Sequence, residues 1–222
     1  MLTQSFIILR PTTSILQVLD MHYFCLHHKD RPDRKEQLLK TFDREELQVE
    51  WVEDFHPNDI NIQDLNLQHD LNINAISVYL KHQKCYELQK EKGYQNILIF
   101  EDDVIIPEDF GFVDFVDRAM VDFESLKGDL MFIGGAFGIS PPLVSPEQIV
   151  YTLPGFKSRC AHCYVVSLRC VDTILDTINI MDDALDWKLN KIIEESGLKV
   201  CYTEPSIKQA TVENLDSSTI QP

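Results

Sequence analysis

The sequence predicts an α/β fold with one largely parallel, mixed sheet flanked by helices. Short apolar or alternating stretches, typical of strands, alternate regularly with longer stretches whose apolar residues recur at helical spacing. The chain has 222 residues, a length that is enough for one large domain with a proper core. Its residues are 44% hydrophobic and 25% charged, which is ordinary for a globular protein. In such sheets ligands bind at the carboxyl ends of the strands, so functional residues are expected there.

The elements follow one another in a regular order. Strands are expected at residues 22–28, 47–53, 96–100, 129–135, 163–168 and 198–205. The first three helices are expected at 31–42, with Pro32 in its first turn, at 73–92, which ends before Gly93, and at 112–128. A fourth helix is expected to begin after Ser167 as its cap, and a fifth to run through Leu185, Leu189 and Ile193 and end at Gly197. The Pro-rich stretch 140–148 is the clearest loop.

The charge balance limits the classes of partner. Lys and Arg number 20 against 36 Asp and Glu, a net charge of −16, which argues against binding to a nucleic-acid backbone. No apolar run approaches the ~20 residues of a membrane span, and the first 20 residues make a poor signal peptide. The six cysteines are then expected to be reduced thiols in a cytoplasmic protein. The sequence leaves the oligomeric state open.

The stretch "ILIFEDDVIIPEDF" at 97–110 carries the most informative pattern. A buried-looking strand runs directly into Glu101, Asp102 and Asp103. Grouped carboxylates are costly to desolvate unless a cation lies beside them. In extended geometry Glu101 and Asp103 project to one side and Asp102 to the other. The first two are therefore candidate ligands of Mg²⁺ or Mn²⁺, and the alternative is a solvated acidic turn.

The sequence "CAHC" at 160–163 resembles a zinc or redox motif. No second ligand pair is visible for a structural zinc, and an alternating strand follows the motif where a redox site needs a helix. Cys160 and Cys163 are therefore interpreted as core or pocket residues, and His162 as a pocket residue.

Several stretches together resemble glycosyltransferase family 25, the lipopolysaccharide-type and procollagen galactosyltransferases. The resemblance rests on "MHYFCLHHKDRPDRKEQL", "ISVYLKHQKCYELQ", the acidic stretch, "AHCYVVSLRCVDTIL" and "DWKLNKIIEESGLKVCYTEPSIKQ". These matches run in the family's order from about Met21 to Gln209. The usual Asn-Leu-Asp of the first strand is Leu26-His27-His28 here, and Lys81-His82 stands in place of Ser-His.

The resemblance implies a single GT-A-like (Rossmann-type) domain over residues 21–222, with residues 1–20 as an extension outside the core. It also implies a metal-dependent glycosyltransferase of the hexosyltransferase type, acting in glycan or lipopolysaccharide biosynthesis. The enzyme would move a sugar from a nucleotide-sugar donor, expected to be UDP-linked, to a hydroxyl of a glycan or glycoconjugate, with inversion. Mn²⁺ or Mg²⁺ and the nucleotide sugar are the implied cofactor and co-substrate.

The resemblance also suggests roles for individual residues. Asp103 would be the direct metal ligand, with Glu101 reaching the metal, a metal-bound water or the ribose. Arg31, Arg34, Lys81, His82, Glu101 and Asp102 are the candidates for binding the nucleotide. Alternatively, the two arginines only begin a solvated helix and His82 is a core histidine.

A transferase of this kind also needs a base for the acceptor hydroxyl. Asp182, Asp183 and Asp186 are the candidates. Acids at a helix start are favoured without catalysis, and Asp186 lies inside the expected helix, so capping explains it least. Asp186 is preferred and Asp183 is second. Two other functions remain open, an inactive nucleotide- or glycan-binding module and a carboxylate-pair glycoside hydrolase.

Overall fold

The structure, a computed structural model, describes residues 21–135, 148–153, 155 and 157–210. Its elements in chain order are β1 Met21–Leu26, α1 Pro32–Arg44, β2 Val49–Val52, the short 3₁₀ helices η2 Pro57–Asp59 and η3 Ile62–Asp64, α2 Ile73–Lys92, β3 Asn96–Glu101, β4 Val104–Ile105, α3 Phe112–Leu126, β5 Leu130–Gly134, β6 Val150–Tyr151, β7 Cys163–Ser167, α4 Leu168–Ile178, α5 Leu185–Ser196 and β8 Val200–Gln209. Among the described residues, no helix combines the length and apolar character needed to cross a membrane.

All the described strands belong to one sheet, in the order β2-β1-β3-β7-β5-β8-β4, with β6 beside β8. Strands β1, β2, β3, β5 and β8 run in one direction, and β7, β4 and β6 run against them. The predicted fold class, an α/β fold with a largely parallel mixed sheet flanked by helices, is therefore confirmed. The antiparallel β7 separates β3 from β5.

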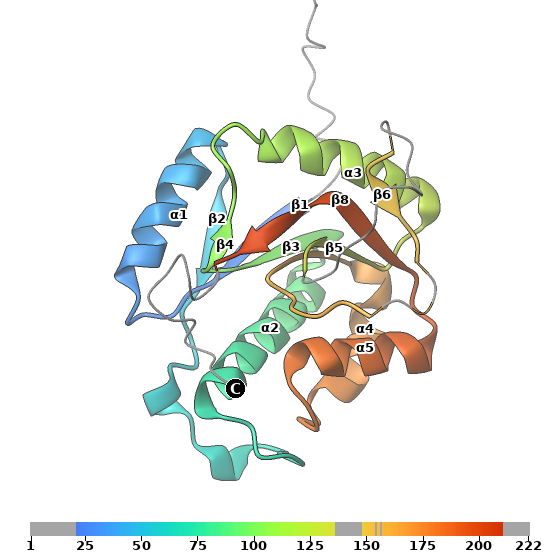
Figure 1. Cartoon of the computed structure of the whole chain (residues 1–222). Helices are drawn as coiled ribbons and strands as arrows, with labels where there is room; N and C mark the ends of the chain where they lie inside the picture. The colour runs from blue at the N-terminus through green and yellow to red at the C-terminus, as the bar shows by residue number, and fades with distance from the viewer. Residues whose placement is uncertain (1–20, 136–147, 154, 156, 211–222) are drawn as a thin grey trace, which may run out of the picture.

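The sheet is covered on both faces (Figure 1), with α1 and α3 above it and α2, α4 and α5 below it. Strand β3 shows how the sequence produces this arrangement. Ile97 and Ile99 belong to the core below the sheet, while Leu98 and Phe100 belong to the core above it. All four side chains are fully buried, because alternate residues of a strand point to opposite faces. A continuous apolar run is what a sheet covered on both faces requires.

The helix ends largely follow the predicted signals. Helix α2 ends before Gly93, which takes the left-handed conformation at φ 73°, and the Ser167 side chain accepts the Arg169 amide at the start of α4. Helix α3 differs, because it ends at Leu126 and Lys127 takes the left-handed conformation. Gly128 is instead needed for close packing, since a Cβ there would lie 2.3 Å from the Phe123 ring.

The last strand extends further than the sequence suggests. β8 continues past the expected end at residue 205 to Gln209 and pairs with β4 through Gln209 and Lys208. This extension carries the end of β8 to the acidic turn between β3 and β4. Most of the Pro-rich loop expected at 140–148 lies outside the described residues.

Residues 1–20 also lie outside the described residues, so their predicted place outside the catalytic core remains a prediction. β1 begins at Met21 and pairs with β2 and β3 along its length. We therefore expect a shortened chain that begins at Met21 to keep the melting temperature of the full chain. Thermal unfolding followed by circular dichroism would measure it. An insoluble shortened chain, or one with a clearly lower melting temperature, would show that the segment is part of the fold.

Candidate active site

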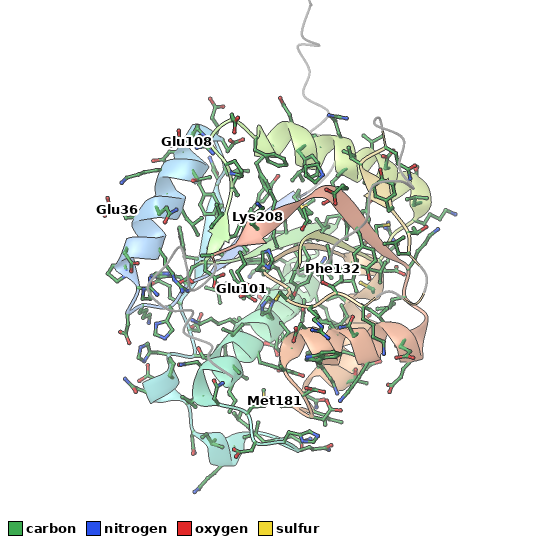
Figure 2. All side chains as sticks on the ribbon, in the orientation of Figure 1. Glu36, Glu101, Glu108, Phe132, Met181 and Lys208 are labelled. Atoms are coloured by element: carbon green, nitrogen blue, oxygen red, sulfur yellow. The ribbon has the colours of Figure 1, made fainter. Side chains whose placement is uncertain are left out.

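The acidic turn lies where four strand ends converge. Glu101 is the last residue of β3, and its Cα is in register with Leu26 at the end of β1. The Glu101 amide donates to the carbonyl of His162, just before β7, at 2.8 Å. The Ala210 amide, just after β8, donates to the Asp103 carbonyl at 2.8 Å. Figure 2 shows Glu101 below the sheet, on the side of α2.

The Asp102 side chain is fully engaged within the protein. Its Oδ2 accepts from His27 Nδ1 at 2.9 Å and from the His28 amide at 2.8 Å, and its Oδ1 accepts from Arg34 at 2.8 Å. Burial alone would raise the pKa of Asp102, but these hydrogen bonds outweigh it and hold the pKa below its usual value. Asp102 thus binds the loop after β1 and the first turn of α1 to the acidic turn.

The Glu101 and Asp103 carboxylates meet at the Gln209 side chain, but Asp102 and Asp103 form a turn after β3 and not the extended strand that the alternation assumed. The Gln209 amide nitrogen lies 3.1 and 3.2 Å from the two Asp103 oxygens and 3.4 Å from Glu101 Oε2. Burial raises the pKa of both carboxyl groups to about 7, and for Asp103 the nearby Glu101 charge adds to this. The turn therefore holds two carboxylates whose charges are poorly compensated by the protein.

Lys81 and His82 lie in α2 and are both buried. Lys81 Nζ donates to the His27 carbonyl at 2.6 Å, and burial lowers its pKa. His82 Nδ1 lies 2.8 Å from the Tyr164 hydroxyl, and its Nε2 lies 3.4 Å from Glu101 Oε1. Burial lowers the pKa of His82 to about 3, so the ring is neutral. His82 is a core histidine that also contacts the acidic turn.

The two arginines of the predicted pair occupy different environments. Arg34 is buried, and its guanidinium lies 2.8 Å from Asp102 Oδ1 and 3.8 Å from Asp103 Oδ2. Arg31 precedes α1 and forms a bidentate ion pair with Asp33, whose side chain is 58% exposed. The structure thus brings Arg34 to the acidic turn and gives Arg31 a partner in the first turn of the helix.

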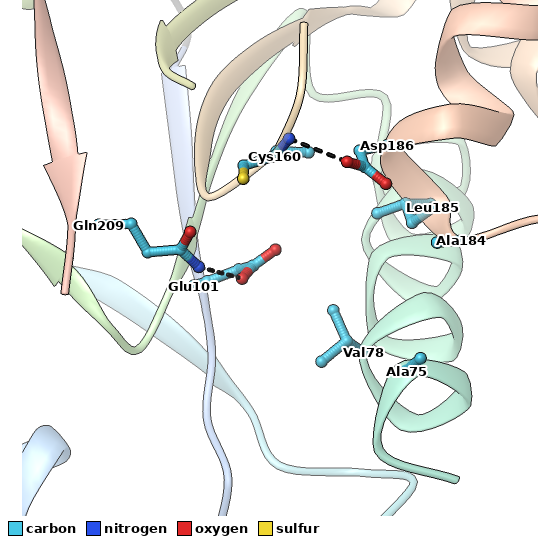
Figure 3. A pocket seen from close by; sticks show the side chains of 9 residues that line it. Ala75, Val78, Glu101, Cys160, Ala184, Leu185, Asp186 and Gln209 are labelled. Atoms are coloured by element: carbon cyan, nitrogen blue, oxygen red, sulfur yellow. Dashed lines mark hydrogen bonds between the residues drawn. The ribbon is translucent and has the colours of Figure 1, made fainter. Parts of the chain in front are cut away.

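A cavity of about 230 Å³ opens beside Glu101. Its lining residues are Ala75, Val78, Glu101, Cys160, Ala161, Ala184, Leu185, Asp186 and Gln209. Figure 3 shows Glu101 and Asp186 entering this cavity from opposite sides, Asp186 from α5, with Ala75 and Val78 of α2 beneath. Asp186 Oδ2 accepts from the Cys160 amide at 2.9 Å, and Oδ1 accepts from the Trp187 amide at 3.0 Å. The structure therefore brings Asp186 and the acidic turn to one cavity.

Asp183 and Asp182 do not line this cavity. Asp183 accepts from the Ala184 amide and forms an ion pair with Lys191 at 3.1 Å. Asp182 pairs with Lys188 at 2.9 Å and with Lys191 at 3.3 Å. The residue before α5 is Ala184, without a side-chain cap, so neither aspartate caps the helix in the usual way.

A second, smaller crevice of about 30 Å³ also borders Glu101 and is lined by Leu26, His28, Arg34, Asn74, Ser77, Val78, Lys81, Glu101, Asp102 and Asp103. Its lining includes the cations Arg34 and Lys81, whereas the described lining of the cavity has acids and no cation. Glu101 and Val78 line both spaces. Below, the first space is called the Asp186 cavity and the second the Arg34 crevice.

Sequence reasoning missed the roles of two residues, Gln209 and His27. Gln209 was noted only as part of the closing match, and 106 positions separate it from Asp103. His27 was noted only as a departure from the family pattern, although it holds Asp102. Of the "CAHC" cysteines, Cys163 lies in the core and Cys160 lines the Asp186 cavity, as expected of core or pocket residues. Only the folded chain shows which distant residues meet the acidic turn.

Comparison with known proteins gives one informative match. Residues 21–128 match the model of glycosyltransferase family 25, described as an LPS biosynthesis protein. That region contains β1, α1, α2 and the acidic turn. No curated protein matches the chain.

Solved structures give weaker likenesses. A glycosyltransferase involved in the glycosylation of the major capsid of PBCV-1 is 12% identical, covers 83% of this chain and 82% of its own, and has a TM-score of 0.43. A mannose-1-phosphate geranyltransferase from Thermus thermophilus is 10% identical, covers 87% and 76%, and has a TM-score of 0.45. These scores are too low to carry a functional conclusion. The sequence match is the stronger finding: residues 21–128, just under half of the chain, match the model of glycosyltransferase family 25, so the expected resemblance to that family is confirmed over β1 to α3.

Proposed function

We propose that this chain is a metal-dependent glycosyltransferase that moves a sugar from a nucleotide-sugar donor to a hydroxyl of a glycan or glycoconjugate. One observation carries the proposal: Glu101 lies between a crevice containing two buried cations and a cavity containing a second carboxylate. A diphosphate needs cationic surroundings, and an acceptor hydroxyl needs a base. A hexosyl group, a UDP donor and an inverting outcome are the finer expectations that the family match favours.

The donor diphosphate would bind in the Arg34 crevice. Arg34 and Lys81 are both held in place, by Asp102 and by the His27 carbonyl. Fixed cations stabilise the negative charge that develops on a leaving diphosphate without reorganising during the reaction. Arg31, which already has Asp33 as its partner, is assigned a smaller part in binding.

The acidic turn fits a hard divalent cation. Glu101 and Asp103 offer carboxylate oxygens, and the amide group of Gln209 already lies between them, where a positive partner is needed. Mg²⁺ and Mn²⁺ accept such oxygens and complete their coordination with water and substrate phosphates. When bound, the ion would neutralise charge on the leaving diphosphate. Asp102, with its oxygens committed to His27, His28 and Arg34, would support the site from behind.

Asp186 would be the base. The acceptor oxygen attacks the anomeric carbon, its proton passes to an Asp186 oxygen, and the nucleoside diphosphate leaves with the bonding electrons. Each Asp186 oxygen accepts one backbone amide, which orients the carboxylate and leaves a second lone pair on each oxygen for the acceptor. Asp183 remains the second candidate, although it lies outside the cavity lining and pairs with Lys191.

One observation also favours a second function, a carboxylate-pair glycoside hydrolase. Glu101 and Asp186 face one cavity from separate elements, and the raised pKa of Glu101 would suit a general acid. A hydrolase has no use for the buried cations of the Arg34 crevice. It would cleave aryl glycosides without any nucleotide, which separates the two functions experimentally.

The first prediction concerns the cation. UDP should bind the full chain in the presence of Mn²⁺, and its affinity should fall at least about tenfold when EDTA removes the ion. The reason is that the ion at the acidic turn would neutralise part of the diphosphate charge, and Arg34 and Lys81 only the rest. Isothermal titration calorimetry measures both affinities. Asp103→Asn should reproduce the EDTA result in the presence of Mn²⁺, and Asp183→Asn, outside both spaces, should not. Equal UDP affinity with and without the ion would contradict the proposal.

The second prediction contrasts two adjacent acids. Asp102→Asn removes the nearest charged partner of the buried Arg34, so the free energy of unfolding should fall by up to about 3–5 kcal/mol. Asp103→Asn removes a carboxylate that burial disfavours, so metal-free protein should gain stability at pH 8, on the order of 1–3 kcal/mol. Chemical denaturation in EDTA measures both.

The sign of the Asp103 effect follows from proton linkage. The folded pKa of about 7 lies above the ordinary value of 3.8, so folded protein holds a proton that unfolded protein has released. Wild-type stability therefore falls as pH rises between these values. The advantage of Asp103→Asn should be full at pH 8 and absent near pH 4. A variant that is less stable than wild type at pH 8 would show that the Asp103 charge is well compensated in the folded protein.

The third prediction separates the two candidate bases. Asp186→Asn should lower turnover by about 10²–10⁴-fold while UDP affinity stays near wild type, because the side-chain amide cannot take a proton. Its one oxygen can accept from the Cys160 amide or from the Trp187 amide but not from both, so a modest fall in melting temperature is expected. Asp183→Asn loses a partly exposed ion pair with Lys191 and should cost about 0–1 kcal/mol of stability with a small kinetic effect. Steady-state transfer assays measure the turnover of both variants, and thermal unfolding measures their stability. Reversed effects would move the base to Asp183.

A further inference from the structure

A separate group of metal-ligating side chains lies on the outer side of the Arg34 crevice. His28, Asp30 and His56 each offer one ligand atom, and these atoms lie within 4.8 Å of one another. Among the described residues this is the one group of three or more His, Cys, Asp or Glu side chains that meets so closely. The acidic turn does not include any of them. The proposed function gives no role to the Asp30 and His56 side chains, and of the three only His28 lines the Arg34 crevice.

The fold explains why these distant residues meet. His28 and Asp30 belong to the loop after β1, and His56 follows β2 and precedes η2. β1 and β2 are parallel neighbours, with Leu26 in register with Val52, so the loops leaving their carboxyl ends lie side by side. The group thus joins two loops at the same edge of the sheet as the acidic turn.

The contacts within the group already bring the ligand atoms together. His56 Nε2 lies 3.1 Å from Asp30 Oδ2, and the His28 and His56 rings have centroids 5.5 Å apart. Zinc bonds of about 2.0–2.1 Å in tetrahedral geometry place ligand atoms about 3.3 Å apart. The ligand atoms would have to close from within 4.8 Å to this separation, and the Asp30 side chain, which is 68% exposed, has room to move.

We propose that His28, Asp30 and His56 form a second cation site, for a borderline ion such as Zn²⁺ or Co²⁺. Two imidazole nitrogens and one carboxylate oxygen suit these ions better than the Mg²⁺ or Mn²⁺ expected at Glu101 and Asp103. Three protein ligands leave a coordination position open. The ion would tie the loop after β1 to the loop after β2, beside the rim of the crevice that His28 also lines.

The ring contacts of the histidines limit the affinity. Nδ1 of His56 accepts from the Asn58 amide and Nδ1 of His28 from the Asp30 amide, both at 3.3 Å. A histidine that ligates through Nε2 usually donates its Nδ1 proton to an acceptor, so binding through Nε2 gives up these two long hydrogen bonds. The site should therefore be weaker than a fully preorganised structural zinc site.

A plain surface ion pair is the alternative, and the chain contains a matched example. His22 on β1 lies 2.9 Å from Glu50 Oε2 on β2, the same pairing of histidine and acid without a third ligand. His22→Gln is thus a control for the loss of a histidine that pairs with an acid on a neighbouring segment.

The test is titration of Co²⁺ and Zn²⁺ into full-length protein freed of metal by a chelator and without nucleotide. Visible absorption follows Co²⁺ binding, and calorimetry follows Zn²⁺. We expect one equivalent to bind, with affinity reduced at least about tenfold in His56→Gln and in Asp30→Asn. His22→Gln should leave the affinity within about twofold of wild type, because His22 is not one of the three proposed ligands. Asp30→Asn, on an exposed loop, provides the test should His56→Gln not fold.

Three results would overturn the second site. They are no specific Zn²⁺ or Co²⁺ binding to wild type, unchanged affinity in both His56→Gln and Asp30→Asn, and loss of the ion in Glu101→Gln rather than in those variants. The last outcome would place the borderline ion at the acidic turn. Because no nucleotide is present, the result is independent of whether UDP binds.

Discussion

The buried carboxylate of Asp102 organises the candidate site. It accepts hydrogen bonds from His27, from the His28 amide and from Arg34, which come from the end of β1, the following loop and the first turn of α1. Lys81, in turn, is held by the carbonyl of His27. Through these contacts one side chain fixes both cations of the Arg34 crevice and the turn that carries Glu101 and Asp103. The position of the site thus depends on a charge whose oxygens are already committed to the protein itself.

Asp102 and its neighbours show how adjacent acids acquire different properties. Asp102 is compensated, and its pKa is lowered, whereas burial raises the pKa of Glu101 and Asp103. Near those two, the protein places the Gln209 amide, the neutral ring of His82 at 3.4 Å from Glu101, and the Arg34 guanidinium at 3.8 Å from Asp103. Buried carboxylates without a nearby positive charge lower the stability of the fold. Groups with such perturbed pKa values cluster at functional sites, where ligands bind. A cation arriving with a diphosphate would supply the missing charge.

Much of this arrangement could be predicted from the sequence because it is local. The buried run 97–100 and its end at Glu101 follow from the apolar pattern of a strand, and Gly93 and Ser167 mark helix ends by their own conformational preferences. The turn that brings Asp103 back beside Glu101 does not follow from that pattern. The antiparallel β7 could not be predicted, because its direction depends on pairing with β3 and β5. Nor could the contacts of Gln209 and His27, because they depend on which strand ends meet. The separation of Arg31 from Arg34 follows from the helix start, where only one of the two faces the sheet.

Central to the proposed function is the splitting of a nucleotide sugar at the junction of the Arg34 crevice and the Asp186 cavity. The most direct measurement is release of nucleoside diphosphate from a panel of nucleotide sugars, without acceptor, in Mn²⁺ and in EDTA. Water then takes the place of the acceptor hydroxyl. We expect slow, Mn²⁺-dependent release from at least one UDP-sugar, abolished in Asp103→Asn and only slightly changed in Asp183→Asn. Release that is independent of the ion and of Asp103, or cleavage of simple aryl glycosides in place of nucleotide sugars, would contradict it.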